Sequence, residues 1–271
     1  MTNQLKRLYN KFFRRKISVI AQIHYTNPSQ RLKGRKIIVT GGTGSIGLAM
    51  AKRFINEGAI VLITGRDKEK LESISKNIGC EASFLDLMNV ESFDKFITEA
   101  KQKLGGIDCL VNNAGISLHE SFESVTTDGF DRQIATNLRG PFFLSQKVIA
   151  YMSTNSIKGQ ILFISSETGE TADIRPYGLS KAAINSLVQG LAYLYIEQDI
   201  RVNAIAPGVT TSNMTGYSND NLYCSFNPNK RVYLPEEIAE IASFILSDIS
   251  NSISGQIITC NNGKTINARW K

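Results

Sequence analysis

Three features of the sequence predict an α/β fold with a doubly wound sheet of about seven parallel strands and helices on both faces. From Lys36 onward, short runs rich in β-branched residues alternate with amphipathic stretches of helical length. The runs are continuously apolar, as in strands that are buried on both faces. A glycine-rich turn at residues 41–47 joins the first run to the first amphipathic stretch, which is typical of a Rossmann-type β-α-β unit.

Each element follows from its local pattern, and repetition of strand and helix favours parallel pairing with crossover helices. Residues 210–234 are rich in Asn, Ser, Tyr and Gly and have little periodicity, so we expect a lid there. The predicted strands are Lys36–Thr40, Ile60–Thr64, Ala82–Leu85, Asp108–Asn112, Gln160–Ser165, Arg201–Ile205 and Gln256–Thr259, and the predicted helices span 46–57, 67–77, 90–103, 128–151, 177–197 and 235–247.

The charge divides the 271 residues into a basic extension, residues 1–33, and one catalytic domain, residues 34–271. Residues 1–36 hold ten of the 31 Lys and Arg and none of the 24 Asp and Glu, so the net charge of +7 belongs to the extension. The rest of the chain is mildly acidic. A nucleic-acid enzyme would carry basic charge on its body, so we expect a small-molecule substrate and no nucleic-acid partner.

The four cysteines are scattered and form no cluster with histidine. This pattern favours a reducing compartment and argues against a metal site or a disulfide framework. No apolar run approaches the roughly 18 to 20 residues that a membrane-spanning helix needs, and the start lacks a signal-peptide pattern. We therefore expect a cytoplasmic protein.

The extension has an amphipathic pattern of its own. Between residues 5 and 17, large apolar side chains recur at helical spacing among Lys and Arg. Such a segment is suited to peripheral contact of residues 1–20 with an anionic membrane. Two alternatives stay open, namely packing on the body or a neighbouring subunit, and a targeting presequence.

The glycine-rich turn predicts the cofactor. Gly42, Gly44 and Gly47 fit the G-x-G-x-x-G pattern, in which glycines allow close approach of a pyrophosphate to a helix N-terminus. The second strand ends in Gly65-Arg66 in place of the acid that holds the ribose of NAD. Because a guanidinium grips a 2′-phosphate, this end favours NADP (NADPH) over NAD.

Tyr177 and Lys181 predict the chemistry. A spacing of four places both side chains on one face of the predicted helix. A phenol has a pKa of about 10, and a neighbouring ammonium stabilises the phenolate and lowers that pKa. The pair could therefore exchange a proton near neutral pH.

These features occur in order with several others, and together they resemble the compact, single-domain type of the short-chain dehydrogenase/reductase family. The resemblance covers about residues 34–263 and implies an NAD(P)(H)-dependent oxidoreductase that interconverts a carbonyl and a secondary alcohol. The motifs that carry it are Thr40–Gly47, Asp86-Leu87, Asn112–Gly115, Asn137, Ser165-Ser166, Tyr177-x3-Lys181 and Pro207-Gly208.

The resemblance also implies residue roles. Tyr177 is the general acid/base, Lys181 lowers its pKa and holds the ribose, Ser166 binds the substrate oxygen, and Asn137 anchors a water relay. We favour Ser166 over the adjacent Ser165 because successive strand residues face opposite sides. The implied cofactor contacts are Gly41, Gly42, Thr43, Gly44, Ser45, Ile46, Gly47, Arg66, Asp86, Leu87, Asn113, Ala114, Gly115, Tyr177, Lys181, Pro207, Gly208 and Ser212.

The sequence also leads to expectations about the substrate and about the oligomeric assembly. Polar positions around the site indicate a polar or sugar-like substrate, with a solvated loop as the alternative. The resemblance implies a homo-oligomer, a tetramer or a dimer, that pairs through helices 128–151 and 177–197. The turn sequence also resembles sugar-nucleotide epimerases and dehydratases of the extended type, and a catalytically idle dinucleotide sensor is a third possibility. The polar positions are His119, Glu167, Arg175, Asn213, Tyr217, Asn219, Asn221, Lys230 and Arg231.

Overall fold

Seven parallel strands form one sheet in the order β3-β2-β1-β4-β5-β6-β7 in the computed structural model, which describes residues 19–20 and 30–267. The predicted doubly wound fold is therefore confirmed. Because β1 pairs with both β2 and β4, the strand order reverses there, and ligands of such sheets bind at the carboxyl ends of the strands near this point. The strands are β1 Lys36–Val39, β2 Ile60–Gly65, β3 Glu81–Phe84, β4 Cys109–Asn112, β5 Gln160–Ile164, β6 Arg201–Pro207 and β7 Ile257–Cys260.

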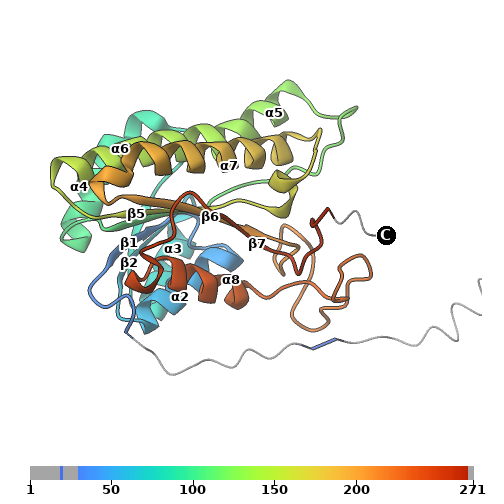
Figure 1. Cartoon of the computed structure of the whole chain (residues 1–271), viewed down its shortest axis with the longest axis horizontal. Helices are drawn as coiled ribbons and strands as arrows, with labels where there is room; N and C mark the ends of the chain where they lie inside the picture. Colours follow the sequence, from blue (N-terminus) through green and yellow to red (C-terminus); the bar gives the residue numbers. More distant parts are fainter. Residues whose placement is uncertain (1–18, 21–29, 268–271) are drawn as a thin grey trace, which may run out of the picture.

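Helices cover both faces of the sheet (Figure 1). On one face lie α4 (Phe93–Leu104), α6 (Gly140–Thr154) and α7 (Pro176–Tyr195), and α2 (Ser45–Asn56), α3 (Lys68–Ile78) and α8 (Pro235–Ile245) lie on the other. Short 3-10 turns complete the chain at Val90–Ser92, Glu167–Glu170, Ile196–Gln198 and Asp248–Ser250.

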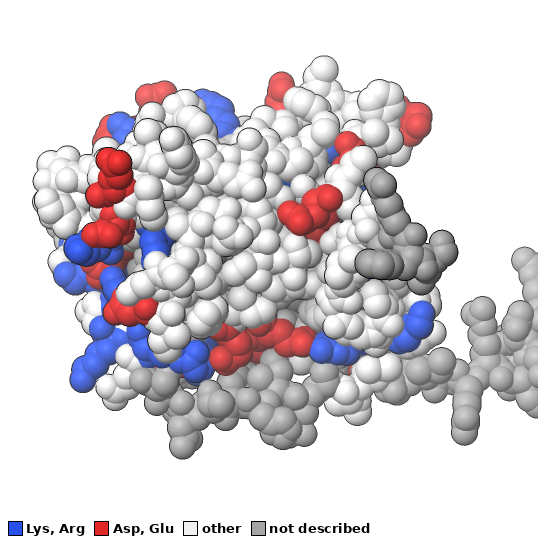
Figure 2. All heavy atoms as spheres, viewed as in Figure 1, with Lys and Arg blue, Asp and Glu red and all other residues white. Residues whose placement is uncertain are grey.

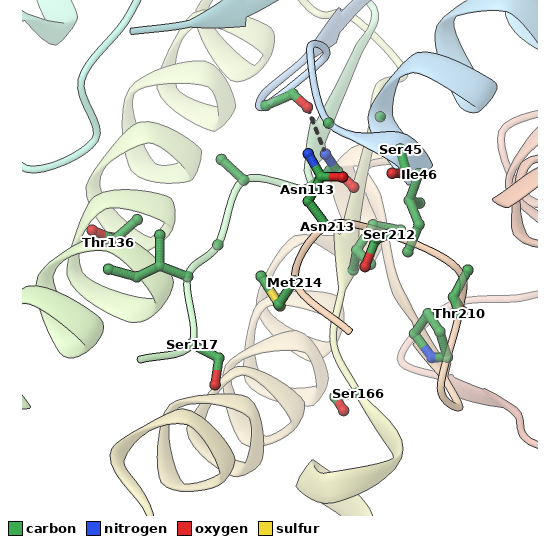
Figure 3. Close-up of a pocket in the computed structure, with 18 of the residues that line it drawn as sticks. Ser45, Ile46, Asn113, Ser117, Thr136, Ser166, Thr210, Ser212, Asn213 and Met214 are labelled. Atoms are coloured by element: carbon green, nitrogen blue, oxygen red, sulfur yellow. Dashed lines mark hydrogen bonds between the residues drawn. The ribbon is translucent and has the colours of Figure 1, made fainter. Parts of the chain in front are cut away.

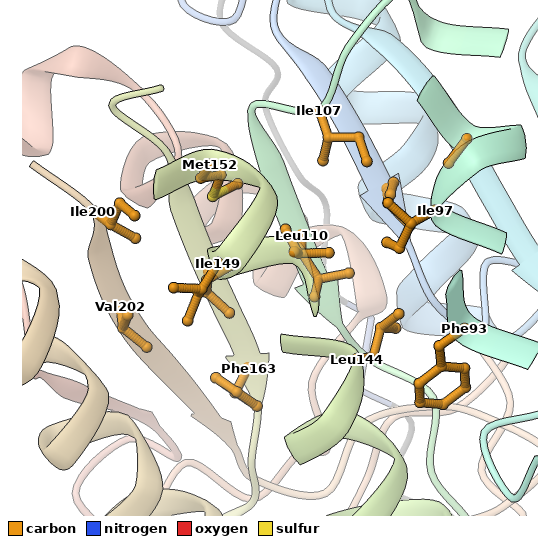
Figure 4. Packing of buried hydrophobic residues seen from close by; sticks show 14 of the residues in the cluster. Phe93, Ile97, Ile107, Leu110, Leu144, Ile149, Met152, Phe163, Ile200 and Val202 are labelled. Carbon is orange, nitrogen blue, oxygen red and sulfur yellow. The ribbon is translucent and has the colours of Figure 1, made fainter. Parts of the chain in front are cut away.

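Each helical layer packs on the sheet through apolar side chains. Figure 4 shows Leu110 and Phe163 on the strands facing Ile149 and Met152 of α6, and all four are at most 2% exposed. Burying one such side chain contributes roughly 1.5 to 3 kcal/mol relative to leaving it in water. These layers fix the strand ends, and thereby the loops that form the site.

The predicted helix 128–151 is in fact three segments: α5 (Thr127–Ile134), a π-helical turn (Ala135–Arg139) and α6. Gly140 begins α6 where the chain passes close to Leu87, since a Cβ at position 140 would lie 2.5 Å from the Leu87 carbonyl oxygen. The apolar periodicity continues through the π turn, so the sequence pattern did not reveal it. The turn contains Asn137, and single π turns are frequent at functional sites.

The chain enters the fold along the α2–β2 connection. Leu32 is completely buried, and its N–H donates to the Glu57 carbonyl. Further upstream, Val19 N–H donates to Asn221 Oδ1 at 3.2 Å, and Val19 O accepts from Leu222 N–H at 3.1 Å. The predicted amphipathic helix at residues 5–17 lies outside the described residues. Within residues 30–267, no helix has the length and apolar character needed to cross a membrane.

Candidate active site

A cavity of about 740 Å³ lies at the carboxyl ends of the central strands. Its wall comes from the loops after β1, β2, β4, β5 and β6 and from the start of α7. Figure 3 shows Ser45 and Asn113 at one end of this cavity and Ser166 at the other. The cavity therefore joins the predicted cofactor residues to the predicted catalytic residues.

The glycine turn shapes the first end of the cavity. Gly41 has a φ of +64°, which favours glycine. A Cβ at Gly47 would lie 2.4 Å from the Gly41 carbonyl oxygen, so a side chain there would close the turn. Helix α2 begins after Gly44, which offers no side-chain cap, and its first residues line the cavity. Uncapped N–H groups at a helix N-terminus fit a dinucleotide phosphate.

Gly42 has a different role from the one predicted. It does not line the cavity, and a Cβ there would lie 2.5 Å from Cβ of Ile63. Gly42 therefore allows the turn to pack against β2 and supports this end of the cavity from behind. The other predicted cofactor residues all lie on the cavity wall.

Asn113 ties the glycine turn to the end of β4. Its Nδ2 donates to the carbonyl oxygens of Thr40 at 2.8 Å and Gly41 at 3.2 Å. Thr40 Oγ1 in turn accepts from the N–H groups of Asn113 and Ala114. Asn113 therefore lines the cavity and also fixes the shape of the turn.

Two cationic side chains, Arg66 and Lys70, lie where β2 ends and α3 begins, and both line the cavity. The adjacent acid, Asp67, does not line it. Its carboxylate accepts from the N–H of Lys70 at 3.0 Å and caps α3. Sequence inspection missed Lys70, although its position one helical turn after Arg66 could have indicated it.

Tyr177 and Lys181 lie one turn apart at the start of α7. Lys181 Nζ lies 5.6 Å from the centre of the Tyr177 ring and donates to the Ile164 carbonyl at 2.8 Å. Burial lowers the pKa of Lys181 to about 8. Burial also raises the pKa of Tyr177, and this outweighs the opposing effects of a hydrogen bond with Ser166 and the charge of Arg175. Among the protein groups alone, the phenol pKa is thus not lowered as expected.

The two adjacent serines face different partners. Ser165 Oγ is buried and donates to Asn185 Oδ1 at 2.6 Å, so it is engaged with α7. Ser166 Oγ accepts from the Thr168 N–H at 3.2 Å, and its interaction with the Tyr177 hydroxyl opposes the rise in the pKa of the phenol. Ser166 is therefore the serine that stands beside the phenol.

Asn137 lies behind the cavity wall. Its Nδ2 donates to the Ile116 carbonyl, and its Oδ1 accepts from the Ile116 N–H, both at 2.8 Å. A Cβ at Gly115 would lie 3.3 Å from Asn137 Oδ1 and 3.7 Å from Lys181 Nζ. The π turn thus brings Asn137 and Lys181 against the same glycine.

The predicted polar surroundings divide into two groups. His119, Glu167, Arg175 and Asn213 line the cavity. The rest of the predicted set does not line it, because the lid folds around a small apolar cluster of its own and its polar groups bond within or beside it. Those residues are Tyr217, Asn219, Asn221, Lys230 and Arg231. Sequence inspection also missed Ser117, Thr136 and Met214 on the wall (Figure 3).

Comparisons with known proteins agree with this geometry. A family model described as enoyl-(acyl carrier protein) reductase matches residues 41–265. The glucose 1-dehydrogenase of Gluconobacter oxydans is 34% identical over 249 residues, which cover 87% of this chain and 94% of the relative. The 3-oxoacyl-(acyl-carrier-protein) reductase of Aquifex aeolicus is 30% identical over 244 residues, covering 86% of this chain and 98% of the relative.

Solved structures share the architecture as well. The 3-ketoacyl-(acyl-carrier-protein) reductase of Brucella melitensis, complexed with NADH, superposes with a TM-score of 0.80 and 29% identity. The superposed region covers 87% of this chain and 100% of the Brucella chain. After Pro207-Gly208 the described chain adds only the lid, α8, a 3-10 turn, β7 and a short C-terminal segment. These matches do not favour the extended epimerase or dehydratase alternative, whose members carry a larger substrate lobe.

Proposed function

The chain belongs to the short-chain dehydrogenase/reductase family, and we propose that it is an NADP-preferring member that uses Tyr177 to exchange a proton with a polar carbonyl or alcohol substrate. One observation carries the proposal. The cavity joins the uncapped start of α2 and Arg66 at one end to Ser166, Tyr177 and Lys181 at the other. A dinucleotide and a small substrate can therefore meet beside the phenol.

The cofactor would be held by groups that the structure already orients. The N–H groups at the start of α2 would hold its phosphates, and Asp86, Asn113 and Pro207, which line the same cavity, would contact the rest of it. A bound nicotinamide dinucleotide supplies the hydride in reduction and accepts it in oxidation. The protein therefore has to position the substrate carbon and manage the proton.

Tyr177 manages the proton. In reduction its hydroxyl donates the proton to the oxygen of the carbonyl group, and in oxidation its phenolate accepts the proton of the alcohol. Ser166 stands beside it as a second hydrogen-bonding group for the same oxygen. Lys181 is fixed by Ile164 and offers a buried ammonium that stabilises the phenolate when it forms. Asn137 holds the neighbouring backbone at Ile116 and lies close to Lys181.

Arg66 and Lys70 support the preference for NADP. A 2′-phosphate carries negative charge and accepts several hydrogen bonds, which a guanidinium and an ammonium on one side of the cavity can supply. Asp67, the acid nearest to them in the sequence, is committed to the start of α3. The NADH complex of the Brucella relative belongs to that protein, so direct titration of both nucleotides is the test for this chain.

The residues of the cavity wall favour a polar substrate, and the cysteines favour a cytoplasmic enzyme. Glu167, His119 and Arg175 surround the catalytic end with hydrogen-bonding groups, which suit a hydroxylated carbonyl compound better than a long aliphatic chain. The four cysteines are free thiols, which supports the proposal of a reducing compartment.

We also propose a homo-oligomer that pairs through α6 and α7. Phe142 is 42% exposed, Leu179 44% and Tyr193 88%. Figure 2 shows few charged side chains over the middle of the face on which α7 lies. An exposed apolar helical face of this kind is typical of a subunit interface.

The proposed activity is tested by the absorbance of NADPH. The purified full chain should oxidise NADPH in the presence of hydroxylated ketones or aldehydes, and it should reduce NADP in the presence of the matching alcohols. Absence of turnover across sugar, small hydroxyketone and acyl substrates would contradict it.

A further inference from the structure

One carboxylate on the cavity wall has not yet been given a contact with the substrate, although its charge adds to the rise in the pKa of Tyr177. Glu167 directly follows Ser166, begins the 3-10 turn Glu167–Glu170 and is only 7% exposed. It lines the cavity together with Ser166 and Tyr177. A buried carboxylate beside the reacting groups needs a partner, because an unpaired charge in such a place is unfavourable.

The two oxygens of Glu167 differ in their surroundings. Oε1 pairs with Nζ of Lys264 at 2.5 Å. Lys264 reaches this position from the turn after β7, and its ammonium also lies 4.9 Å from the centre of the Phe226 ring. Oε2 is shielded from solvent and has no hydrogen-bond partner among the described residues. One acceptor is therefore held in place without a donor.

The ion pair indicates which kind of donor would suit Oε2. The ammonium of Lys264 already balances the charge of the carboxylate, so a second cation would bring excess positive charge into a buried place. A neutral hydroxyl satisfies the oxygen without adding charge. Glu167 lines the cavity but its Oε2 is covered, so a ligand brings that hydroxyl to Oε2 by displacing the groups that cover this oxygen.

We propose that Glu167 is a specificity-determining residue whose Oε2 accepts a hydrogen bond from a substrate hydroxyl near the reacting carbon. This inference rests on the proposed function, since Ser166 and Tyr177 must hold the reacting oxygen for Glu167 to lie beside the neighbouring carbons. A substrate that lacks the hydroxyl leaves the oxygen unpaired, and sites of this kind discriminate strongly against such analogues.

Tyr233 is a protein group that could compete for this role. Burial raises the pKa of Tyr233, the charge of Arg231 opposes this rise, and the charge of Glu167 adds to it. The Tyr233 hydroxyl is shielded from solvent, and an interaction with the Asn229 side chain also opposes the rise in its pKa. If Tyr233 were the donor to Oε2, the carboxylate would be structural and would not distinguish substrates.

The test compares butan-2-one with 3-hydroxybutan-2-one and 4-hydroxybutan-2-one, using NADPH and the full chain. We expect kcat/KM to be at least about tenfold higher for a hydroxylated ketone than for butan-2-one. In the double variant Glu167→Leu/Lys264→Met this ratio should fall to about one, whatever the change in kcat/KM for butan-2-one itself. The double variant removes both charges, so no unpaired ion is left buried.

Glu170→Gln is the matched control, because Glu170 lies on the same turn but both of its oxygens already accept hydrogen bonds, from Asn185 and Thr259. This variant should keep the wild-type ratio, and so should Tyr233→Phe. An unchanged ratio in the double variant, or an equal loss in Tyr233→Phe, overturns the proposal.

Calorimetric binding of the same ketones to the enzyme–NADPH complex separates the two proposals. Discrimination in binding without turnover contradicts the proposed function alone. Turnover without discrimination contradicts the role of Glu167 alone, and equal or absent binding of the ketones also overturns that role.

Discussion

Lys181 donates a hydrogen bond from its buried Nζ to the carbonyl oxygen of Ile164 at 2.8 Å, at the carboxyl end of β5. A single carbonyl does not replace the hydration of an ammonium. Burial accordingly lowers the pKa of Lys181 from 10.5 to about 8. The fold therefore holds this lysine at a cost to its stability, which is consistent with a role in the reaction.

The first prediction follows from this pKa. Between about pH 8 and pH 10.5 the unfolded chain binds a proton at Lys181 that the folded chain lacks, so the free energy of unfolding should rise with pH. Lys181→Met removes this contribution. From pH 7 to pH 10.5, the wild type should gain up to about 3 kcal/mol relative to the variant. Urea unfolding of both proteins across this range measures the difference, and a constant difference would contradict the prediction.

The second prediction concerns Tyr177. Replacing it by Phe removes the hydroxyl and leaves the ring, so the fold and cofactor binding should persist. Turnover should fall by at least about a hundredfold, because the positioned proton donor is lost. Tyr195→Phe, at the other end of α7, is the control and should keep wild-type turnover. Near wild-type rates in Tyr177→Phe would exclude the phenol as the general acid/base.

The third prediction concerns the nucleotide. Arg66→Ala should weaken NADPH binding by at least about tenfold and leave NADH binding nearly unchanged, because only NADPH carries the 2′-phosphate. Lys70→Ala should act in the same direction. Lys68→Ala is the control, since Lys68 lies over the Phe84 ring and does not line the cavity. Titration of nucleotide fluorescence measures all four proteins, and equal affinity of the wild type for both nucleotides would reduce Arg66 to a surface charge.

The fourth prediction concerns assembly. Phe142→Arg/Tyr193→Arg places charges on the exposed faces of α6 and α7 and should lower the molar mass seen by light scattering at micromolar concentration. Ile60→Arg is the control, because Ile60 is 45% exposed but lies at the start of β2. A wild-type protein that is strictly monomeric would contradict the proposed interface.

Local patterns predicted most of the fold because strands such as β2 and β5 are mostly apolar and most of the helices are amphipathic. The same patterns could not predict which side chains meet across the fold. The pairing of Glu167 with Lys264 joins residues 97 positions apart, and neither residue belongs to a motif. The lid gives the clearest example of a side-chain partner that local patterns do not predict. Arg231 was predicted near the site but pairs with Glu237.

Gly42 and Asn137 show a second limit. Each belongs to a motif, but the motif does not state whether a residue contacts a ligand or supports one that does. In the structure, Gly42 lies close to Ile63, and Asn137 makes two hydrogen bonds with the backbone of Ile116. These contacts with Ile63 and Ile116 depend on tertiary packing, and the spacing of residues in a motif does not specify them.

The fifth prediction concerns the part of the N-terminal extension before Gln30, where Val19 makes two hydrogen bonds with the lid at Asn221 and Leu222. A chain that begins at Gln30 lacks this contact and the basic amphipathic segment. It should keep kcat, because the proposed catalytic groups lie in the π turn, after β5 and on α7, away from this contact. Its KM should rise modestly, because the lid loses two hydrogen bonds of about 1 kcal/mol each.

Vesicles decide whether the extension also binds a membrane. Each Lys or Arg close to an anionic surface contributes about 1 kcal/mol, so the full chain should co-sediment with phosphatidylserine-rich vesicles and be released by salt, whereas the chain from Gln30 should stay in solution. Asn221→Ala in the full chain separates the two roles, since it should raise KM and leave vesicle binding unchanged. Equal, salt-insensitive behaviour of the long and short chains would exclude the membrane role, and a raised KM in Asn221→Ala would then favour packing of the extension against the lid.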